Sequence, residues 1–176
     1  ALGENGLPTT CEARVGFART ILNAALEAGI ARENVAIDCL TLTVSAQQDQ
    51  VKQTLEAVAR VRGELGLETV LGVSNISFGL PQRTLVTQAF LTQAIQSGLT
   101  LPIINPNQKE MMDAVDACRV LSGEDAHCAA YIERHAAQTK PQAKQKPGVK
   151  LFATKPPQRR ESCWRPCPRL TWWKRS

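Results

Sequence analysis

The sequence lacks any run of about 18 consecutive apolar residues, the length that a transmembrane helix needs. It also lacks a basic segment followed by an apolar stretch near its start, which is the pattern of a secretory signal peptide. We therefore expect a cytoplasmic protein without a membrane partner. The chain begins at Ala1 rather than at an initiator methionine, so we expect a fragment or a processed product.

A disulfide framework and a common zinc motif are also missing. Six cysteines are scattered over 176 residues, which is typical of free thiols in a chain without a secretion signal. Cys163 and Cys167 are one residue too far apart for a CxxC ligand pair, and no second pair accompanies them. The other zinc candidates match no common ligand spacing, so we expect no metal bound by this chain; they are Cys118, His127, Cys128 and His135.

Charge, proline and tryptophan divide the chain into two parts. Residues 1–136 carry 10 Lys/Arg and 15 Asp/Glu, a net charge of −5, whereas residues 137–176 carry 11 Lys/Arg and one acid, a net charge of +10. The second part holds 6 of the 10 prolines and all 3 tryptophans, with no helical periodicity. We therefore predict a folded domain over residues 1–136. Residues 137–176 are predicted to be a disordered basic tail, with the character of a truncated linker or a frameshifted segment.

The first 136 residues alternate between helical and strand patterns. Helix-capping pairs precede amphipathic runs, and glycines close them. Short apolar runs between these helices predict strands at residues 35–37, 69–73 and 101–104. The predicted helix starts are the capping pattern at residues 9–12, Ser45 with Gln48, Pro81, and Asn107 with Glu110.

Continuous apolar strands that alternate with amphipathic helices predict a parallel sheet buried on both faces. A doubly wound open sheet and a TIM (β/α)8 barrel both fit this pattern. The polar residues Asp38, Asn75 and Asn105 follow the strands at intervals of 37 and 30 residues, close to the roughly 31 residues per unit of a TIM barrel. The sequence contains neither GxGxxG nor GxxxxGK, which weakens the dinucleotide-binding and P-loop alternatives.

The barrel is therefore favoured, but only part of one is present. Three strands cannot close an eight-stranded barrel, so we predict an α/β fold that is the C-terminal portion of a TIM barrel, about three βα units. Active sites of such barrels gather at the carboxyl ends of the strands, where Asp38, Asn75 and Asn105 lie.

A carboxylate and an amide at neighbouring strand ends form a candidate recognition pair. Asn is disfavoured in strands, and a buried amide must satisfy two donors and an acceptor, so Asn75 is the most informative polar residue. Ser74 and Ser77 offer hydroxyls that would orient it. A pocket with these groups suits a flat polar heterocycle that displays donors and acceptors. Alternatively, Asp38 caps a loop and Asn105 starts a turn.

Several motifs resemble one family. Residues 38–46 (DCLTLTVSA), 71–81 (LGVSNISFGLP) and 103–106 (IINP) are similar to the pterin-binding domain of cobalamin-dependent methionine synthase and of methyltetrahydrofolate:corrinoid methyltransferases. The serine–asparagine strand end followed by FGLP is the most specific piece. Residues 2–8 (LGENGLP) and 119–123 (RVLSG) extend the resemblance over most of the predicted domain.

The resemblance implies a TIM barrel whose last three strands are present here. It implies that Asp38 binds the pterin ring of methyltetrahydrofolate and that Asn75 hydrogen-bonds near pterin N5, where an amide would stabilise the changing charge as the methyl group leaves. The other pterin-binding candidates are Ser74, Ser77 and Asn105, and Arg83 is a further one.

The family's chemistry also implies partners. The N5-methyl group would move to cobalt(I) of a cobalamin carried by a separate domain or protein, and homocysteine would bind to a domain elsewhere. The strands that precede Ala1 in the family carry further pterin contacts, so we expect little or no activity from this chain alone. Three positions depart from the family pattern, namely Gly3, Cys39 and Thr87.

Two other functions fit parts of the sequence. Dihydropteroate synthase shares the barrel and the pterin pocket, but the Ser-Arg-Lys type of cluster at its phosphate-binding end is not found here. The basic, tryptophan-bearing tail would suit single-stranded nucleic acid by charge and stacking. The remaining chain carries no nucleic-acid-binding motif, which argues against that function.

Overall fold

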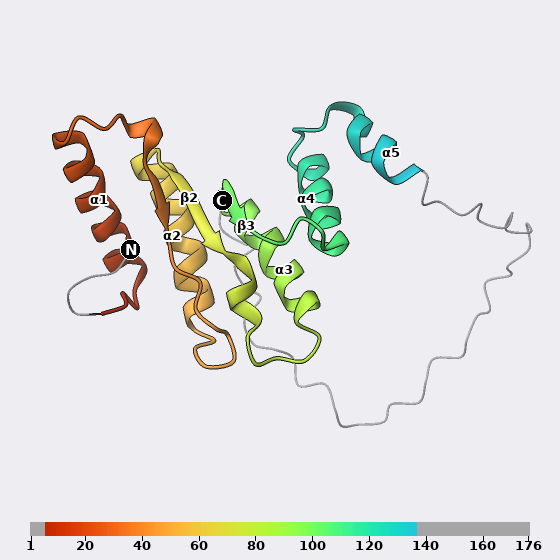
Figure 1. Ribbon diagram of the computed structural model, residues 1–176, viewed down its shortest axis with the longest axis horizontal. Helices are drawn as coiled ribbons and strands as arrows, with labels where there is room; N and C mark the ends of the chain where they lie inside the picture. Colours follow the sequence, from red (N-terminus) through yellow and green to blue (C-terminus); the bar gives the residue numbers. More distant parts are fainter. Residues whose placement is uncertain (1–5, 137–176) are drawn as a thin grey trace, which may run out of the picture. The chain divides into compact units, whose positions relative to one another are not determined.

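The computed structural model describes residues 6–136. The remaining segments, residues 1–5 and 137–176, lie outside the described part, and with them the predicted disordered tail and its two cysteines. In the described part the chain alternates helix and strand, as predicted from the sequence (Figure 1).

Five α-helices and three strands make up the described part, with three short 3-10 helices between them. The α-helices are α1 (Cys11–Glu27), α2 (Gln50–Leu65), α3 (Arg83–Gln96), α4 (Lys109–Leu121) and α5 (Ala129–Ala136). The strands are β1 (Ala36–Asp38), β2 (Glu68–Gly72) and β3 (Leu101–Ile103), and the 3-10 helices are η1 (Arg32–Asn34), η2 (Val73–Ser77) and η3 (Ala126–Cys128).

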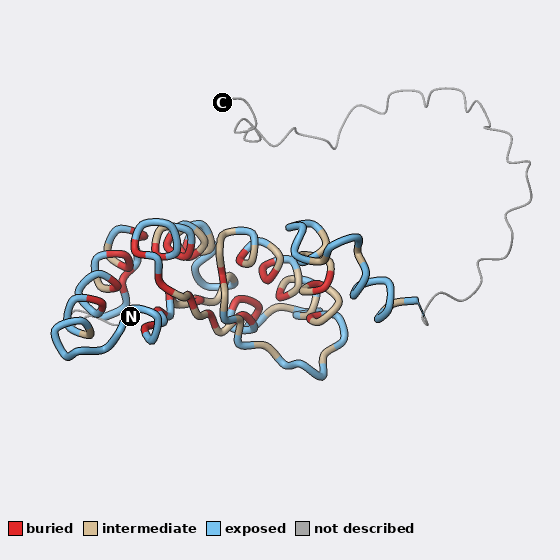
Figure 2. The backbone as a smooth tube through the Cα atoms, turned by 90° about the horizontal axis from the view of Figure 1, so that it is seen from above, coloured by how far each residue is buried: buried red, intermediate tan, exposed pale blue. Residues whose placement is uncertain are grey.

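The strands form one parallel sheet in the order β1-β2-β3. Asp38 of β1 pairs with Val70 of β2, and Gly72 of β2 pairs with Ile103 of β3. The predicted parallel arrangement is therefore confirmed, and each strand lies within one residue of its predicted position. Figure 2 shows the strands beneath a row of helices.

The two faces of this sheet differ in burial. Ile37, Thr69 and Leu71 point toward the helices and are at most 3% exposed. On the opposite side, Leu101 and Ile103 of β3 are 47% and 60% exposed. We call this side the open face; by strand register it comprises Ala36, Asp38, Glu68, Val70, Gly72, Leu101 and Ile103.

The expectation that the strands are buried on both faces is therefore wrong for the described part. Helices pack against one face of the three strands, and within residues 6–136 no second layer lies against the other. The apolar core lies between the helices and the sheet, where Val58 of α2, Leu71 of β2 and Leu91 of α3 are fully buried. Full burial of such a side chain contributes about 1.5–3 kcal/mol.

The helix starts test the capping patterns. The predicted capping pattern at residues 9–12 does mark the start of α1, but the cap is Thr10, whose Oγ1 accepts a hydrogen bond of 3.2 Å from the backbone N–H of Ala13. The prediction that Ser45 caps the next helix is wrong, since α2 begins after Asp49. The Ser45 hydroxyl instead donates to the carbonyl of Phe78, which lies 33 residues away in the sequence.

The starts of the two later helices also differ from prediction. α3 begins at Arg83 rather than at Pro81, because Gln82 adopts a left-handed conformation with φ of 46° that a helix cannot continue. α4 begins after Gln108, so Asn107 is not its cap, contrary to prediction. In both cases the chain needs extra residues to turn from the sheet edge into the helix.

α5 is attached to α4 by charged groups rather than by an apolar core. None of its residues is buried, whereas Asp116 of α4 is only 6% exposed. Arg134 donates to the Asp116 carboxylate, and His135 Nε2 lies 3.3 Å from it. The Tyr131 ring packs on His135 with their centroids 4.4 Å apart. Asp116 is therefore the main anchor of α5.

None of the helices in residues 6–136 has the length and apolar character that a membrane span requires.

We expect Asp116→Asn to release α5 while leaving the rest of the fold intact. The amide keeps the shape of the carboxylate but loses the charge that Arg134 and His135 contact. Loss of a charged hydrogen bond of this kind corresponds to roughly tenfold faster amide exchange over Ala129–Ala136. Hydrogen exchange with mass spectrometry measures it.

Asp113→Asn is the matched control, because Asp113 lies on the same helix and is 3.9 Å from His135 but pairs chiefly with Lys109. It should change α5 exchange much less. Equal effects of the two variants would contradict the assignment of Asp116 as the anchor.

Candidate functional site

The predicted site residues Asp38 and Asn105 lie at the carboxyl ends of β1 and β3, at one edge of the sheet. Each holds a local turn. Asp38 Oδ1 accepts a 2.8 Å hydrogen bond from the Leu40 N–H, and Asn105 Oδ1 accepts one of 3.0 Å from the Asn107 N–H. The loop-capping role that was open for Asp38 and the turn role that was open for Asn105 are both observed.

Asn75 lies in the 3-10 helix η2 rather than at the end of a strand, and its side chain is exposed. The expectation of a buried amide oriented by neighbouring serines is therefore wrong: β2 ends at Gly72 and the chain turns immediately. Among the described residues, no side chain hydrogen-bonds the Asn75 amide. This amide is thus presented outward on a fixed backbone.

Gly72 shows on which face the Asn75 amide lies. A Cβ atom built on Gly72 would lie 3.0 Å from Asn75 Nδ2. Gly72 belongs to the open face, because it is two residues beyond Val70, the partner of Asp38. The Asn75 amide therefore folds over the open face, the same face to which Asp38 belongs. Sheet geometry brings the carboxylate and the amide to one face and one edge.

The loop after β1 is hydrogen-bonded to η2. Thr43 Oγ1 donates to the Asn75 carbonyl at 3.3 Å, and the Val44 N–H donates to the Ile76 carbonyl at 2.9 Å. The Ser45 hydroxyl adds a 2.8 Å bond to the carbonyl of Phe78. We call these two segments, residues 39–49 and 73–79, the rim. Its cross-links fix the backbone that carries Asn75 relative to the loop that follows Asp38.

Arg83, the first residue of α3, forms hydrogen bonds to the second segment of the rim. Arg83 Nε donates to Ser77 Oγ at 3.1 Å and its Nη2 donates to the Ser74 carbonyl at 2.9 Å. The guanidinium carbon lies 4.3 Å from the centroid of the Phe78 ring, a cation–π contact. Ser77 Oγ is fully buried and also lies 2.8 Å from Thr87 Oγ1. The Ser77 hydroxyl is therefore engaged inside the protein, and Ser74 contributes its carbonyl.

Leu40 and its hydrogen-bond partners Arg14 and Thr54 were not singled out from the sequence. Leu40 has a φ of 65°, which is unusual for a residue with a Cβ atom. Its carbonyl accepts hydrogen bonds from Arg14 and Thr54, both buried. Burial also raises the pKa of the Cys39 thiol to about 12, with a further contribution from the charge of Asp38. Cys39 is therefore neutral and acts as a packing residue.

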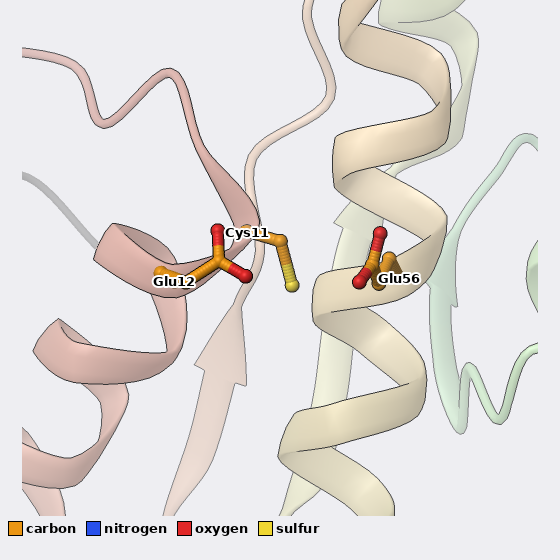
Figure 3. Close-up of side chains that lie close together, drawn as sticks. All are labelled: Cys11, Glu12 and Glu56. Carbon is orange, nitrogen blue, oxygen red and sulfur yellow. The ribbon is translucent and has the colours of Figure 1, made fainter.

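One group of side chains has the composition of a metal site. Figure 3 shows Cys11 and Glu12 of α1 facing Glu56 of α2, and their ligand atoms lie within 4.8 Å of one another. However, Arg60 Nη1 lies 3.8 Å from Cys11 Sγ and 3.3 Å from Glu12 Oε1. Burial raises the pKa of the Cys11 thiol, so it stays protonated. The group is better described as an ion-pair contact between two helices.

The zinc candidates named from the sequence are not gathered either. Within residues 6–136 the structure brings no three of them together. His135 contacts Asp116, and both Cys118 and Cys128 are free thiols.

Comparison with known proteins shows what this chain is similar to. The model of the family "Pterin binding enzyme" matches residues 7–105. The chain is 28% identical over 129 residues to a methylcorrinoid:tetrahydrofolate methyltransferase of Eubacterium limosum, covering 72% of this chain and 47% of that protein. It is 29% identical over 115 residues to methionine synthase of Mycobacterium leprae (strain TN), covering 61% of this chain and 10% of that protein. The chain thus spans about half the length of the first relative and a tenth of the second.

We expect Gly72→Ala to displace the Asn75 side chain with little effect on stability. The new Cβ would lie 3.0 Å from Asn75 Nδ2, which is tighter than most real Cβ contacts, and the exposed amide can move away. The side-chain NH₂ signals of Asn75 in a ¹⁵N-correlated NMR spectrum should shift.

Gly63→Ala is the control for that experiment. A Cβ there meets nothing within 4 Å, and Gly63 lies within α2. It should leave the Asn75 signals in place and stabilise the fold by about 0.5–1 kcal/mol. Unmoved Asn75 signals in Gly72→Ala would refute the stated position of the amide.

Proposed function

The chain belongs to the pterin-binding enzyme family, as its match over residues 7–105 establishes, and from this premise we propose what it does. It resembles methionine synthase and corrinoid-dependent methyltransferases, so we propose that it binds methyltetrahydrofolate and orients the N5-methyl group for transfer to cobalt(I) of a cobalamin. Because it spans about half of the first relative, the complete reaction is proposed with further protein segments supplying the remaining contacts.

The observation that carries this proposal is the shared position of Asp38 and Asn75. A carboxylate and an outward-pointing amide lie on the open face at the carboxyl edge of a parallel sheet, which is where α/β enzymes bind ligands. The family match over residues 7–105 includes both residues and Asn105. The pattern suits a pterin, a flat heterocycle with several N–H donors and acceptor atoms along its edges.

Asp38 is proposed to recognise the pterin ring. A carboxylate has about four lone-pair sites, so Asp38 can accept N–H groups of the ring while it continues to hold the Leu40 N–H. These contacts are the same before and during methyl transfer. Asp38 therefore contributes to binding rather than to the rate of the chemical step.

Asn75 is proposed to act on the reacting nitrogen. As the methyl group leaves N5, the electron pair of the broken bond remains on that nitrogen, which becomes a better hydrogen-bond acceptor. An amide N–H held close to N5 strengthens its bond as this charge develops, and such preorganised donors are a main source of catalysis. The rim supports this role, since it fixes the Asn75 backbone through its carbonyl and leaves the side chain available.

The other predicted residues are assigned supporting roles. We propose that Ser77 and Arg83 hold η2 in place, because their polar atoms are bonded to Thr87 and to the Ser74 carbonyl. Asn105 lies at the outer end of the site and shapes its turn. The exposed Ser74 side chain remains a candidate for direct contact.

The methyl acceptor is proposed to reside outside this chain. A corrinoid held by a separate domain or protein would supply a nucleophilic cobalt(I) to accept the methyl group, and homocysteine would bind to another domain. The protein described here contributes binding, orientation and a hydrogen bond. The names of the relatives favour methyl transfer over the dihydropteroate synthase alternative, which uses a similar pterin pocket.

The proposal predicts different defects for its two principal residues. Asn75→Ala should lower the rate of methyl transfer from methyltetrahydrofolate to cob(I)alamin by about 10²–10³, the usual effect of removing one such donor. Asp38→Asn should mainly weaken pterin binding. The assay uses a chimera in which this chain replaces the matching segment of the Eubacterium limosum protein.

Asn107→Ala is the matched control, because Asn107 is an exposed asparagine near the same edge and uses its backbone N–H, not its side chain, in the turn. It should transfer methyl groups normally. Near-normal transfer by Asn75→Ala, or a large loss of melting temperature in that variant, would show that the amide is structural and overturn the proposed mechanism.

A further inference from the structure

Arg14 is a buried cation without a carboxylate partner in the described residues. It lies in α1, and 2% of it is exposed. All four of its hydrogen bonds go to neutral oxygens: the Pro8 and Leu40 carbonyls, Thr54 Oγ1 and Gln50 Oε1. A carboxylate is linked to Arg14 only indirectly, because Gln50 Nε2 donates a hydrogen bond to Asp49.

A guanidinium in such surroundings is costly for folding. Burial disfavours the charged form, and the pKa of Arg14 is lowered for that reason. Hydrogen bonds to neutral oxygens offset part of this cost, and the acceptors would lose a donor if Arg14 were removed. The structural consequence of this costly arrangement is the backbone segment that the guanidinium holds.

That backbone is the turn that follows Asp38. Arg14 Nη1 contacts the Leu40 carbonyl at 3.4 Å and Thr54 Oγ1 at 2.6 Å. The Thr54 hydroxyl in turn donates to the same Leu40 carbonyl at 3.1 Å. Two buried donors thus converge on one carbonyl oxygen. On the other side of the same residue, the Leu40 N–H donates to Asp38 Oδ1 at 2.8 Å.

Leu40 has no intrinsic preference for the conformation it adopts. Its φ of 65° lies in the left-handed region, which is unfavourable for residues with a Cβ atom. Such conformations persist when the surrounding structure holds them in place, and they cluster at ligand sites. Arg14 and Thr54 supply that hold at the Leu40 carbonyl.

We propose that Arg14 is a positioning residue for the pterin site: with Thr54 it holds Leu40 in its left-handed turn, and the Leu40 N–H in turn fixes the Asp38 carboxylate. This inference rests on the proposed function, since it assigns Asp38 to pterin recognition. Arg14 itself does not reach the ligand. The buried face of α1 therefore controls a binding group on the open face of the sheet.

The test uses the full chain and two readouts. In Arg14→Met the first readout is the backbone amide of Leu40 by NMR, which reports the bond to Asp38 without any ligand. Its signal should shift and its exchange with solvent should accelerate. The second readout is the affinity for methyltetrahydrofolate, measured by titration of the chimera that carries the same substitution, which should fall about tenfold, as for other residues that orient a binding group.

Thr54→Val provides a second variant that keeps the shape of the side chain and removes one of the two donors to Leu40. It should change both readouts in the same direction and to a smaller extent. Val15→Ala is the control, because Val15 is the neighbouring buried residue of α1 and makes only apolar contacts. At a temperature well below all the melting points, it should leave both readouts unchanged.

The outcomes separate the two proposals. An unchanged Leu40 amide in both Arg14→Met and Thr54→Val would overturn the positioning role. So would an equal loss of affinity in Arg14→Met and Val15→Ala. If the chimera with the unaltered chain fails to bind methyltetrahydrofolate, the proposed function is what fails, and the Leu40 amide then decides alone whether Arg14 holds the turn.

Discussion

The parallel pairing of β1 with β2 in a single register is the constraint on which the site depends. Asp38 pairs with Val70, and this pairing puts Asp38 on the face opposite the helices. A slip of one residue would turn every side chain of β1 to the other face, and Asp38 would point into the apolar core. Ile37 opposes such a slip, because it is 3% exposed under the helices and would have to enter water. An ordinary core contact therefore determines where the carboxylate lies.

The sequence predicted the strands, their parallel direction and the edge at which the polar residues gather, because these features follow from local hydrophobic patterns. It did not predict the hydrogen bonds that make the site rigid. Ser45 was assigned to a helix cap by its local pattern, whereas it bonds to Phe78 far along the chain. Arg14 contacts Leu40 and Thr54, which are 26 and 40 positions away in the sequence, and no periodic pattern predicts such partners. Local hydrophobic patterns predict where helices and strands lie, whereas hydrogen bonds between distant segments depend on how the chain folds.

The burial of Asn75 was mispredicted for a related reason. The apolar run before it was extended one residue too far as a strand, so the asparagine seemed to lie inside a sheet. In the structure β2 ends at Gly72 and η2 begins at Val73, so the Asn75 amide lies outside the hydrogen-bonded sheet. Gly72 lacks a side chain where the amide folds over the sheet. The position of the Asn75 amide therefore depends on the absence of a side chain at Gly72, a contact that the pattern of either residue alone does not predict.

In the candidate site, the backbone atoms of a residue are held by hydrogen bonds while its side-chain atoms face outward. The backbone around Asn75 is tied by Thr43, Arg83 and the helical turn itself, while the side-chain amide makes no hydrogen bond to any described side chain. One oxygen of Asp38 accepts the Leu40 N–H, and Arg14 and Thr54 donate to the Leu40 carbonyl. An exposed amide on such a fixed backbone does not have to break a hydrogen bond to a described side chain or reorganise its backbone when a ligand arrives. Electrostatic catalysis requires this condition, since a donor that must first be moved into position loses in reorganisation what it contributes to the transition state. The buried Arg14 and the exposed Arg83 thus have the same effect, because each holds the backbone next to one of the two polar groups at the surface.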